Sequence, residues 1–422
     1  MTRNFVSYGA RLRRPLMLLA ASVALVFLAA CGGGGGNNTT PTSRLKHRAF
    51  VSNMFAGTLQ IVDTQNDTTA FTQQTTNSAG QIVQGQPVSI IVSTSVTFQV
   101  EAADKSVTAV YDPTAHVLWI VMNSTEMTLG NVPLTSAAGM ALFSPDNSKL
   151  YAPEPNLAID GQRNGGVEAV DRSTGSVSAT YAVPSARYIA LSPNGQYLLI
   201  FADNSDSVFL VNLNATTVMP MEIPGFARPV NAFFSSDSNT AYVLNCGPEC
   251  GSGAPASVTQ LNLPSMAIMA SVPVGGASVG LLNGTTLYVA GSPVPPGTTS
   301  TFDAVNVSNM TRITTNSVPI SDGFHTTMAL APNNKLYIGA SSCTNTTTGC
   351  LSVVDVSNNT ADPALPPRGA ITSLLAVANR NVVYAVEGGL LNVYDTTTDT
   401  LKPTQFNFQG LGALYSVVQV DP

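Results

Sequence analysis

The chain has 422 residues and a formal net charge of −6 at pH 7, with only 10% of its residues charged. An acidic chain is a poor partner for nucleic acid and for anionic lipid, so we exclude electrostatic binding to DNA or RNA. Abundant Thr, Ser, Asn and Gly suit exposed sheet and turns better than helix, and the length is ample for a large core.

The first thirty residues have the layout of a secretion signal. A basic stretch precedes an apolar run from Leu16 to Leu28, and the small residues Ala29 and Ala30 follow it. The run is shorter than the roughly 20 apolar residues that a spanning helix needs, which favours cleavage. Removal of this segment takes away four arginines and lowers the net charge from −6 to −10.

Cys31 follows this signal directly. Leu28-Ala29-Ala30-Cys31 resembles the lipobox of bacterial lipoproteins, and the resemblance implies cleavage before a cysteine that carries a diacylglycerol. The alternative is an uncleaved anchor with an incidental cysteine. Gly32, directly after the cysteine, favours the outer membrane by resemblance to sorting in enteric bacteria.

The segment after Cys31, GGGGGNNTTPT (32–42), is polar and rich in glycine, so it should behave as a flexible spacer. We therefore predict a signal peptide at 1–30, a lipidated cysteine with a tether at 31–46, and a folded domain at 47–422. The domain would lie at the cell envelope, held on a membrane by lipid.

A repeat organises the chain beyond the tether. Each copy has an aromatic or β-branched strand, a loop, and a second strand that ends in Asp or Asn; the copy with LSVVDVSNN (351–359) is among the clearest. Asp or Asn suits this place because its side chain accepts hydrogen bonds from backbone amides two residues on. The eight turn residues are Asp63, Asp112, Asp171, Asn212, Asn262, Asn306, Asp355 and Asp395.

Two further strands complete each unit. A nearly continuous apolar strand lies between units, as in MALFSPDN (140–147), YIALSPNG (188–195) and VSIIVSTS (88–95). A less regular strand follows each turn, as in VLWIVM (117–122). Four antiparallel strands per unit, without a helical period, are typical of a β-propeller blade.

The repeat resembles the YVTN-type β-propeller family, whose unit reads roughly I-A-L-S-P-D-G, L-Y-V-A-N, V-S-V-I-D-x-x-T. Residues 188–216 are the closest stretch, and family members are often seven-bladed. Residues 48–63 lack an inner strand before them, whereas 411–420 match an inner strand with nothing after it. We therefore predict an all-β propeller of eight four-stranded antiparallel blades, closed by the C-terminal strand. A seven-bladed ring with a degenerate unit at 77–135 is the alternative.

Long loops between the second and third strands of a unit should emerge on one face, which is our leading binding site for a protein or glycan partner. They are residues 152–166, 245–257, 291–301 and 340–350. Two of them carry cysteine pairs, Cys246 with Cys250 and Cys343 with Cys350. Exported cysteines this close in the sequence favour disulfides, with a four-thiolate zinc site as the alternative.

The central funnel is the second candidate site. His325 precedes an inner strand, and Arg187 and Arg228 hold comparable positions. These three donors could bind a carboxylate or a sugar acid, or be scattered polar residues at a channel mouth. Residues 276–280 spell G-x-S-x-G, but they open an inner strand rather than a helix, so we expect no nucleophile elbow there.

The sequence thus favours a membrane-tethered binding or scaffold module without a predicted metal or cofactor. The alternative is a propeller enzyme of the lactonase or lyase type acting at the funnel, because propellers that resemble these repeats include such enzymes. Fold alone cannot choose between them.

Overall fold

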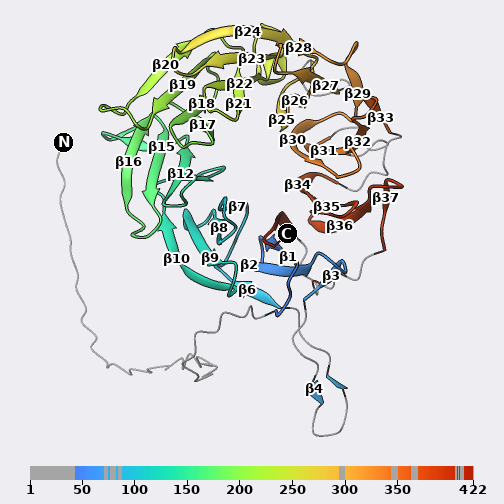
Figure 1. The fold of residues 1–422 in the computed structure, drawn as a ribbon. Coiled ribbons are helices and arrows are strands. Elements are labelled where there is room, and N and C mark those ends of the chain that lie inside the picture. The colour runs from blue at the N-terminus through green and yellow to red at the C-terminus, as the bar shows by residue number, and fades with distance from the viewer. Residues whose placement is uncertain are drawn as a thin grey trace, which may run out of the picture. The chain divides into compact units, whose positions relative to one another are not determined.

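The repeat units fold into eight antiparallel blades arranged in a ring (Figure 1). The computed structural model describes residues 43–70, 75–76, 82–83, 88–293, 300–343, 350–362, 369–403, 406, 408 and 413–421. Among these residues, no helix is long and apolar enough to cross a membrane.

The blades follow each other in chain order, and each runs from an inner strand at the channel to an outer strand at the rim. Blade 1 contains β38 (Leu414–Gln419), β1 (Arg48–Asn53), β2 (Thr58–Asp63), and the outer pieces β3 (Thr68–Thr69) and β6 (Ser89–Ile91). Blade 2 contains β7 (Gln99–Glu101), β8 (Val107–Asp112), β9 (Val117–Met122) and β10 (Met127–Pro133); blade 3 contains β11 (Leu142–Phe143), β12 (Lys149–Glu154), β15 (Gly166–Asp171) and β16 (Val177–Ala182). Blade 4 contains β17 (Ala186–Leu191), β18 (Tyr197–Ala202), β19 (Ser207–Asn212) and β20 (Pro220–Pro224).

The second half of the ring repeats this pattern. Blade 5 contains β21 (Pro229–Phe234), β22 (Thr240–Asn245), β23 (Ser257–Asn262) and β24 (Ala267–Pro273); blade 6 contains β25 (Val279–Asn283), β26 (Thr286–Gly291), β27 (Ser300–Asn306), β28 (Thr311–Arg312) and β29 (Val318–Ile320). Blade 7 contains β30 (Phe324–Leu330), β31 (Lys335–Ser342), β32 (Leu351–Asp355) and β33 (Thr360–Ala361); blade 8 contains β34 (Ile371–Ala376), β35 (Val382–Glu387), β36 (Leu390–Asp395) and β37 (Thr400–Leu401). Two small hairpins, β4 (Thr75–Thr76) with β5 (Ile82–Val83) and β13 (Ala158–Ile159) with β14 (Gln162–Arg163), lie outside the blades.

The Asp and Asn turn residues close hairpins as predicted. Asp63 Oδ1 accepts a hydrogen bond from the backbone N–H of Gln65 at 2.9 Å, and Asp395 accepts one from Thr397 at 2.9 Å. The same bond forms at Asp112, Asp171, Asn212, Asn306 and Asp355, and at Asn262 it comes from three residues on. These bonds satisfy backbone N–H donors within the turns, so the sequence of each turn itself favours the reversal of chain direction there.

The hydrophobic core lies between blades. Leu199 and Phe201 of β18 pack in one cluster with Ala241 and Val243 of β22, and all four are fully buried. Second strands can therefore be apolar on both faces, because each face meets a neighbouring sheet. This explains the near-continuous burial of β1, β18 and β35.

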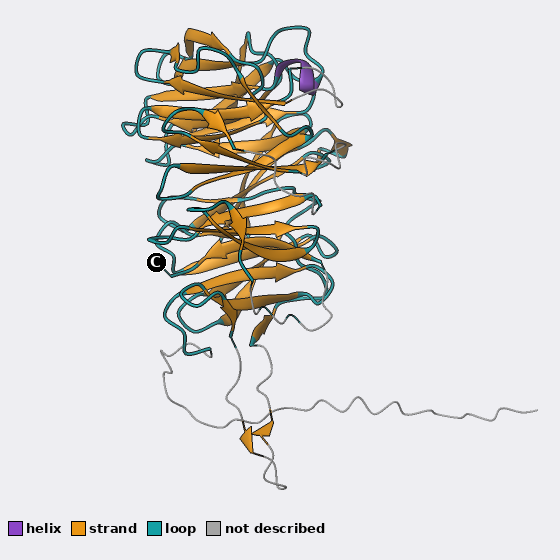
Figure 2. Cartoon of the chain, turned by 90° about the vertical axis from the view of Figure 1, so that its right-hand side faces the viewer, coloured by secondary structure: helices purple, strands orange, loops and turns teal. Residues whose placement is uncertain are grey.

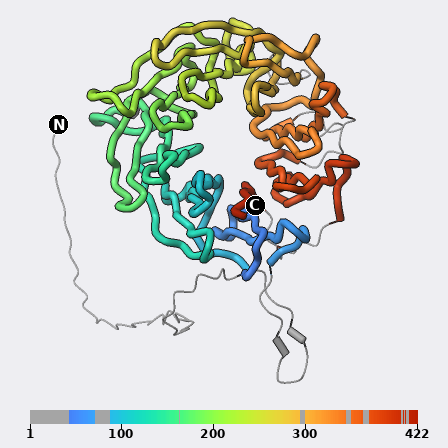
Figure 3. The backbone as a smooth tube through the Cα atoms, in the orientation of Figure 1, coloured from blue at the N-terminus to red at the C-terminus, as the bar shows by residue number. Residues whose placement is uncertain are grey.

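The two ends of the described chain complete one blade. β38 pairs antiparallel with β1, with Phe50 opposite Val418, and Figure 3 shows the blue beginning of the described residues meeting the red C-terminal end there. Buried Arg48 reinforces the joint, since its guanidinium donates to Asp421 at 2.9 Å and to Glu126 of the neighbouring blade 2 at 2.8 Å. The prediction of eight blades closed by the C-terminal strand is confirmed.

Blade 2 corrects the predicted strand assignment. The segment 88–95 is not an inner strand: β6 pairs with β2 at the rim of blade 1 and leaves Ile91 79% exposed. Asp112 lies in the turn between the second and third strands, one connection earlier than predicted. The error arose because an Asp turn is local and does not tell which strands it joins. The seven-bladed alternative is also wrong, because residues 99–133 form a full blade of the ring.

Arg48 provides a test of closure. Arg48→Met should lower the free energy of unfolding by about 3 kcal/mol, because it leaves the buried carboxylate of Glu126 without its cation. Adding Glu126→Gln should recover part of the loss. The control Arg187→Met removes a solvent-exposed ion pair and should cost less than about 1 kcal/mol. Equal losses for the two single variants in urea unfolding would contradict this role.

Candidate binding face and funnel

The four long loops all join second to third strands, as predicted, and therefore leave the ring on one face, which we call the loop face. Figure 2 views the ring edge-on, with the short helix η1 (Gly247–Cys250) of the 245–257 loop on one side and the chain end after β38 on the other. We call that opposite side the turn face. Residues 294–299 and 344–349 of two of the long loops lie outside the described residues.

Two disulfides brace this face. Cys246 is bonded to Cys250 and Cys343 to Cys350, with Cα atoms 5.6 and 5.4 Å apart. The predicted pairings are confirmed, and the zinc alternative is wrong because no free thiolate remains in either loop. Such bonds form and persist in oxidising compartments, which indicates an extracytoplasmic location. Cys31, the predicted lipid site, lies outside the described residues.

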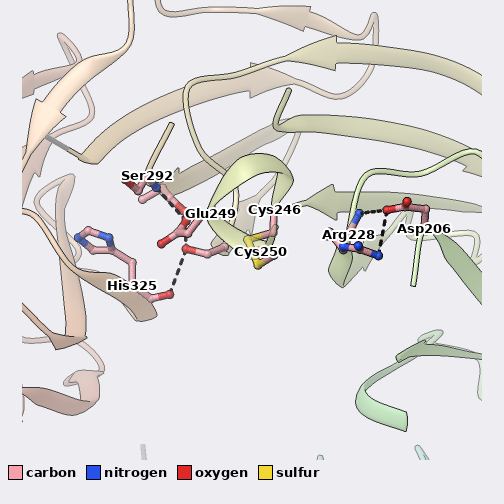
Figure 4. The surroundings of a disulfide bond; sticks show 9 residues. Asp206, Arg228, Cys246, Glu249, Cys250, Ser292 and His325 are labelled. Carbon is pink, nitrogen blue, oxygen red and sulfur yellow. Dashed lines mark hydrogen bonds and ion pairs between the residues drawn. A yellow bond between two sulfur atoms is a disulfide. The ribbon is translucent and has the colours of Figure 1, made fainter. Parts of the chain in front are cut away.

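Glu249 connects the first of these loops to the next blade (Figure 4). Helix η1 holds it between the two bonded cysteines, and its Oε2 accepts a hydrogen bond from the backbone N–H of Ser292 at 2.8 Å. Burial raises its pKa to about 7, while hydrogen bonds from Ser292 and Ser278 act in the opposite direction. Gly291 makes room for it, since a Cβ there would lie 2.8 Å from Glu249 Oε2.

A cavity of about 230 Å³ lies at the loop-face ends of the inner strands of blades 4 to 7. Its wall combines aromatic side chains with polar ones, among them Tyr188, Asn231, Ser278, Phe324 and Thr326. A second hollow of about 190 Å³ shares Tyr188 and Phe324 with it and reaches Cys250 of the braced loop. The funnel mouth and the disulfide loop thus form one continuous surface.

The two predicted arginines lie at this mouth, each beside an aspartate. Arg187 of β17 donates to Asp203 Oδ2 through Nε and Nη2, at 2.9 and 2.6 Å, and this bond raises its pKa above the ordinary value. Arg228, just before β21, lies 3.5 Å from Asp206 and donates its backbone N–H to the same carboxylate. The positive charges are therefore offset locally, which disfavours a carboxylate ligand relative to an uncharged one.

His325 lies in β30 and is fully buried. Burial lowers its pKa to about 4, more than the charge of Asp322 and a backbone group of Gly323 raise it, so the ring is neutral at pH 7. Its backbone carbonyl, not its ring, accepts a hydrogen bond from Ser278 at 3.3 Å. The three predicted donors thus lie around one part of the ring without converging on one point.

Ser278 of the G-x-S-x-G segment precedes strand β25, as predicted, rather than a helix. Its hydroxyl is 3.3 Å from the backbone oxygens of both Ala290 and His325. The Glu249 carboxyl is a third partner of this hydroxyl, and no imidazole among the described residues holds its hydrogen as in an activated serine nucleophile.

Sequence reasoning missed Glu249, Asp203 and Asp206. A signal existed for Asp203, because the hairpin of β17 and β18 places Ala186 opposite Ala202 and so brings Arg187 next to the following aspartate. Glu249 had a weaker signal: it is the acid enclosed by the Cys246–Cys250 pair. Its approach to the next blade depends on the packing of two blades, which no local pattern reports.

Comparisons with known proteins identify the fold. No protein family matches the chain, and none of the curated proteins matches it in sequence. Dihydro-heme d1 dehydrogenase NirN in complex with DHE is similar in structure, with a TM-score of 0.64 and 11% identity, over 90% of this chain and 79% of that chain. A functionally unknown protein from Desulfotomaculum acetoxidans has a TM-score of 0.55 and 14% identity, over 89% and 99%. The β-propeller domain of Myceliophteria thermophila Cps50 (Swd1) has a TM-score of 0.51 and 10% identity, over 71% and 96%. This chain has a β-propeller fold.

The pKa of Glu249 predicts a pH dependence of stability. As pH rises from 4.5 toward 7, the unfolded state ionises this carboxyl while the folded state still holds the proton, so the folded protein loses stability. Glu249→Gln should match the parent at pH 4 and be more stable at pH 8, measured as urea midpoints. Glu154, whose pKa burial raises to about 8, titrates in both proteins and cancels from the comparison.

The control variant is Glu222→Gln, which removes the carboxylate of an exposed glutamate on β20 instead of a buried one and should not reproduce the gain in stability at pH 8. Parallel profiles for the parent and Glu249→Gln would contradict the raised pKa.

Proposed function

We propose that this protein is held on a bacterial envelope membrane by lipid on Cys31 and binds a protein or glycan partner through its loop face. One observation carries the binding role: two disulfides brace long loops on the same face as the funnel mouth. Bracing lowers the entropy that a loop loses when it binds, and loops on a rigid scaffold commonly carry binding. The propeller would be the scaffold.

The proposed lipid anchor is supported by the sequence around Cys31 and by the oxidising compartment that the disulfides indicate. The lipobox-like Leu28-Ala29-Ala30-Cys31 and the glycine-rich tether support attachment, and the disulfides agree with export. The same proposal includes the outer membrane as the location. It also includes the resemblance of residues 188–216 to the YVTN-type repeat.

Metabolic labelling tests the anchor. Cells grown with a palmitate analogue should incorporate it into the parent protein, and Cys31→Ala should abolish the label, because acylation needs the Cys31 thiol and the new amino terminus. Cys246→Ser with Cys250→Ser removes two other cysteines and should keep the label. Retained label in Cys31→Ala would disprove lipid attachment at this residue.

Site-specific photo-crosslinking tests the binding face. A photoreactive amino acid at exposed Ala254, in the braced loop, should yield an adduct with an envelope component, whereas one at exposed Thr174 on the turn face should not. Removing the neighbouring disulfide by Cys246→Ser with Cys250→Ser should weaken the Ala254 adduct about fivefold, because the loop would lose preorganisation. Adducts from Thr174 alone, or equally from both sites, would contradict binding at the loop face.

A second candidate function is an enzyme of the lactonase or lyase type at the funnel. One observation favours it: Glu249, with a pKa of about 7, lies near Ser278 at the cavity wall. A carboxyl that titrates near neutral pH suits a general base. The two functions differ in their dependence on this proton, since turnover would follow the ionisation of Glu249 and partner binding at the loops would not.

A further inference from the structure

Three large apolar side chains are exposed at the rim where blades 1 and 2 meet. Ile91 is 79% exposed, Met127 61% and Leu129 53%. They lie close together, because β6 and β10 are in contact and Thr128, between Met127 and Leu129, donates from Oγ1 to the backbone oxygen of Ile91 at 3.4 Å. We call these three residues the seam patch. Contiguous exposed apolar side chains typically mark an interaction surface.

A basic pocket of about 620 Å³ adjoins the seam patch on the turn-face side and shares Leu129 with it. Four cations line it against one carboxylate: Lys46, Arg48, Lys105 and Arg172 against Asp421. Arg48 is used in ring closure, and Lys105 lies 3.8 Å from Glu101. Lys46 and Arg172 form no ion pair with the described residues, and Nε of Arg172 is buried without a hydrogen-bond partner. The local charge is thus opposite in sign to that of the whole chain.

The last residues of the predicted tether (31–46) lie at this surface. The backbone N–H of Ser43 donates to Glu126 at 2.7 Å, directly before Met127 of the seam patch. Twelve residue steps separate Ser43 from Cys31, a span of at most about 40 Å when extended. A flexible chain of this length has a root-mean-square span of about 19 Å. A lipid on Cys31 would therefore keep the seam patch close to the bilayer.

We propose that the seam patch and the basic pocket dock on the membrane surface, with Ile91, Met127 and Leu129 at the acyl boundary and Lys46 and Arg172 against anionic lipid headgroups. The inference rests on the proposed anchoring at Cys31. Apolar side chains next to cations match the chemistry of a lipid interface, where acyl chains lie beneath phosphates. Docking by this rim would leave the loop face free for a partner.

A second exposed apolar group on the rim provides the control. Met219 beside β20 and Met269 in β24 are 58% and 62% exposed, comparable to the seam patch, but they lie on blades 4 and 5, where no tether joins the ring. If exposure alone led to membrane contact, both groups would touch lipid equally. If the tether and the basic pocket select the surface, only the seam patch would.

The test uses the full lipidated protein in vesicles of equal parts phosphatidylethanolamine and phosphatidylglycerol that contain a photoreactive diazirine lipid. Mass spectrometry should find lipid adducts on peptides with Ile91, Met127 or Leu129 and at least about tenfold fewer on those with Met219 or Met269. Lys46→Glu with Arg172→Glu should reduce the seam adducts about tenfold, because two cations near an anionic surface become anions. Excess inorganic phosphate should leave the adducts unchanged, since the proposed occupant is the membrane.

The other possible outcomes distinguish failure of the docking from failure of the anchor. Equal labelling of both rim groups, or loss of the seam adducts on adding phosphate, would overturn docking by the seam patch. A lipidated Cys31 peptide without seam adducts would overturn the docking while keeping the anchor. A Cys31 peptide without lipid would instead overturn the proposed anchoring.

Discussion

Antiparallel pairing of β38 with β1 is the constraint on which the rest of the structure depends. Each blade presents its two faces to neighbours, so a ring that failed to close would expose two apolar sheet faces. Arg48 strengthens the joint because one buried guanidinium contacts the chain end at Asp421 and the next blade at Glu126. The same joint fixes where the chain enters the ring, and hence where any tether begins.

A polar contact that repeats on each side of blade 8 also links neighbouring blades. Asp67, in the turn after β2, accepts hydrogen bonds from Tyr384 and Arg380 of blade 8, and Asp399 of blade 8 accepts one from Tyr337 of blade 7. Although burial opposes ionisation of Asp67, hydrogen bonds from its partners hold its pKa below the ordinary value. Each aspartate lies four residues after a turn aspartate, so one short motif both closes its hairpin and contacts the preceding blade.

The sequence predicted features that depend on local chemistry or on counting strands, and missed those that depend on packing between blades. Turns such as those at Asp63 and Asp395, the two short-range disulfides and the closing strand follow from side-chain reach and strand order. The predicted strand assignment of blade 2 was shifted by one strand, because the Asp112 turn has the same sequence pattern as the other Asp turns. The partner of Glu249 was missed because Ser292 approaches it only when blades 5 and 6 pack together.

The two faces of the ring have different chemistry, and closure explains why. Antiparallel blades send every connection between second and third strands to one face, where long insertions such as 245–257 disturb no strand pairing. The two ends of the described part of the chain instead meet at the turn face, where Lys46 and Arg172 lie. With the proposed lipid on Cys31, the chain would contact a membrane and present its loops to a partner at the same time, because the fold separates the two surfaces.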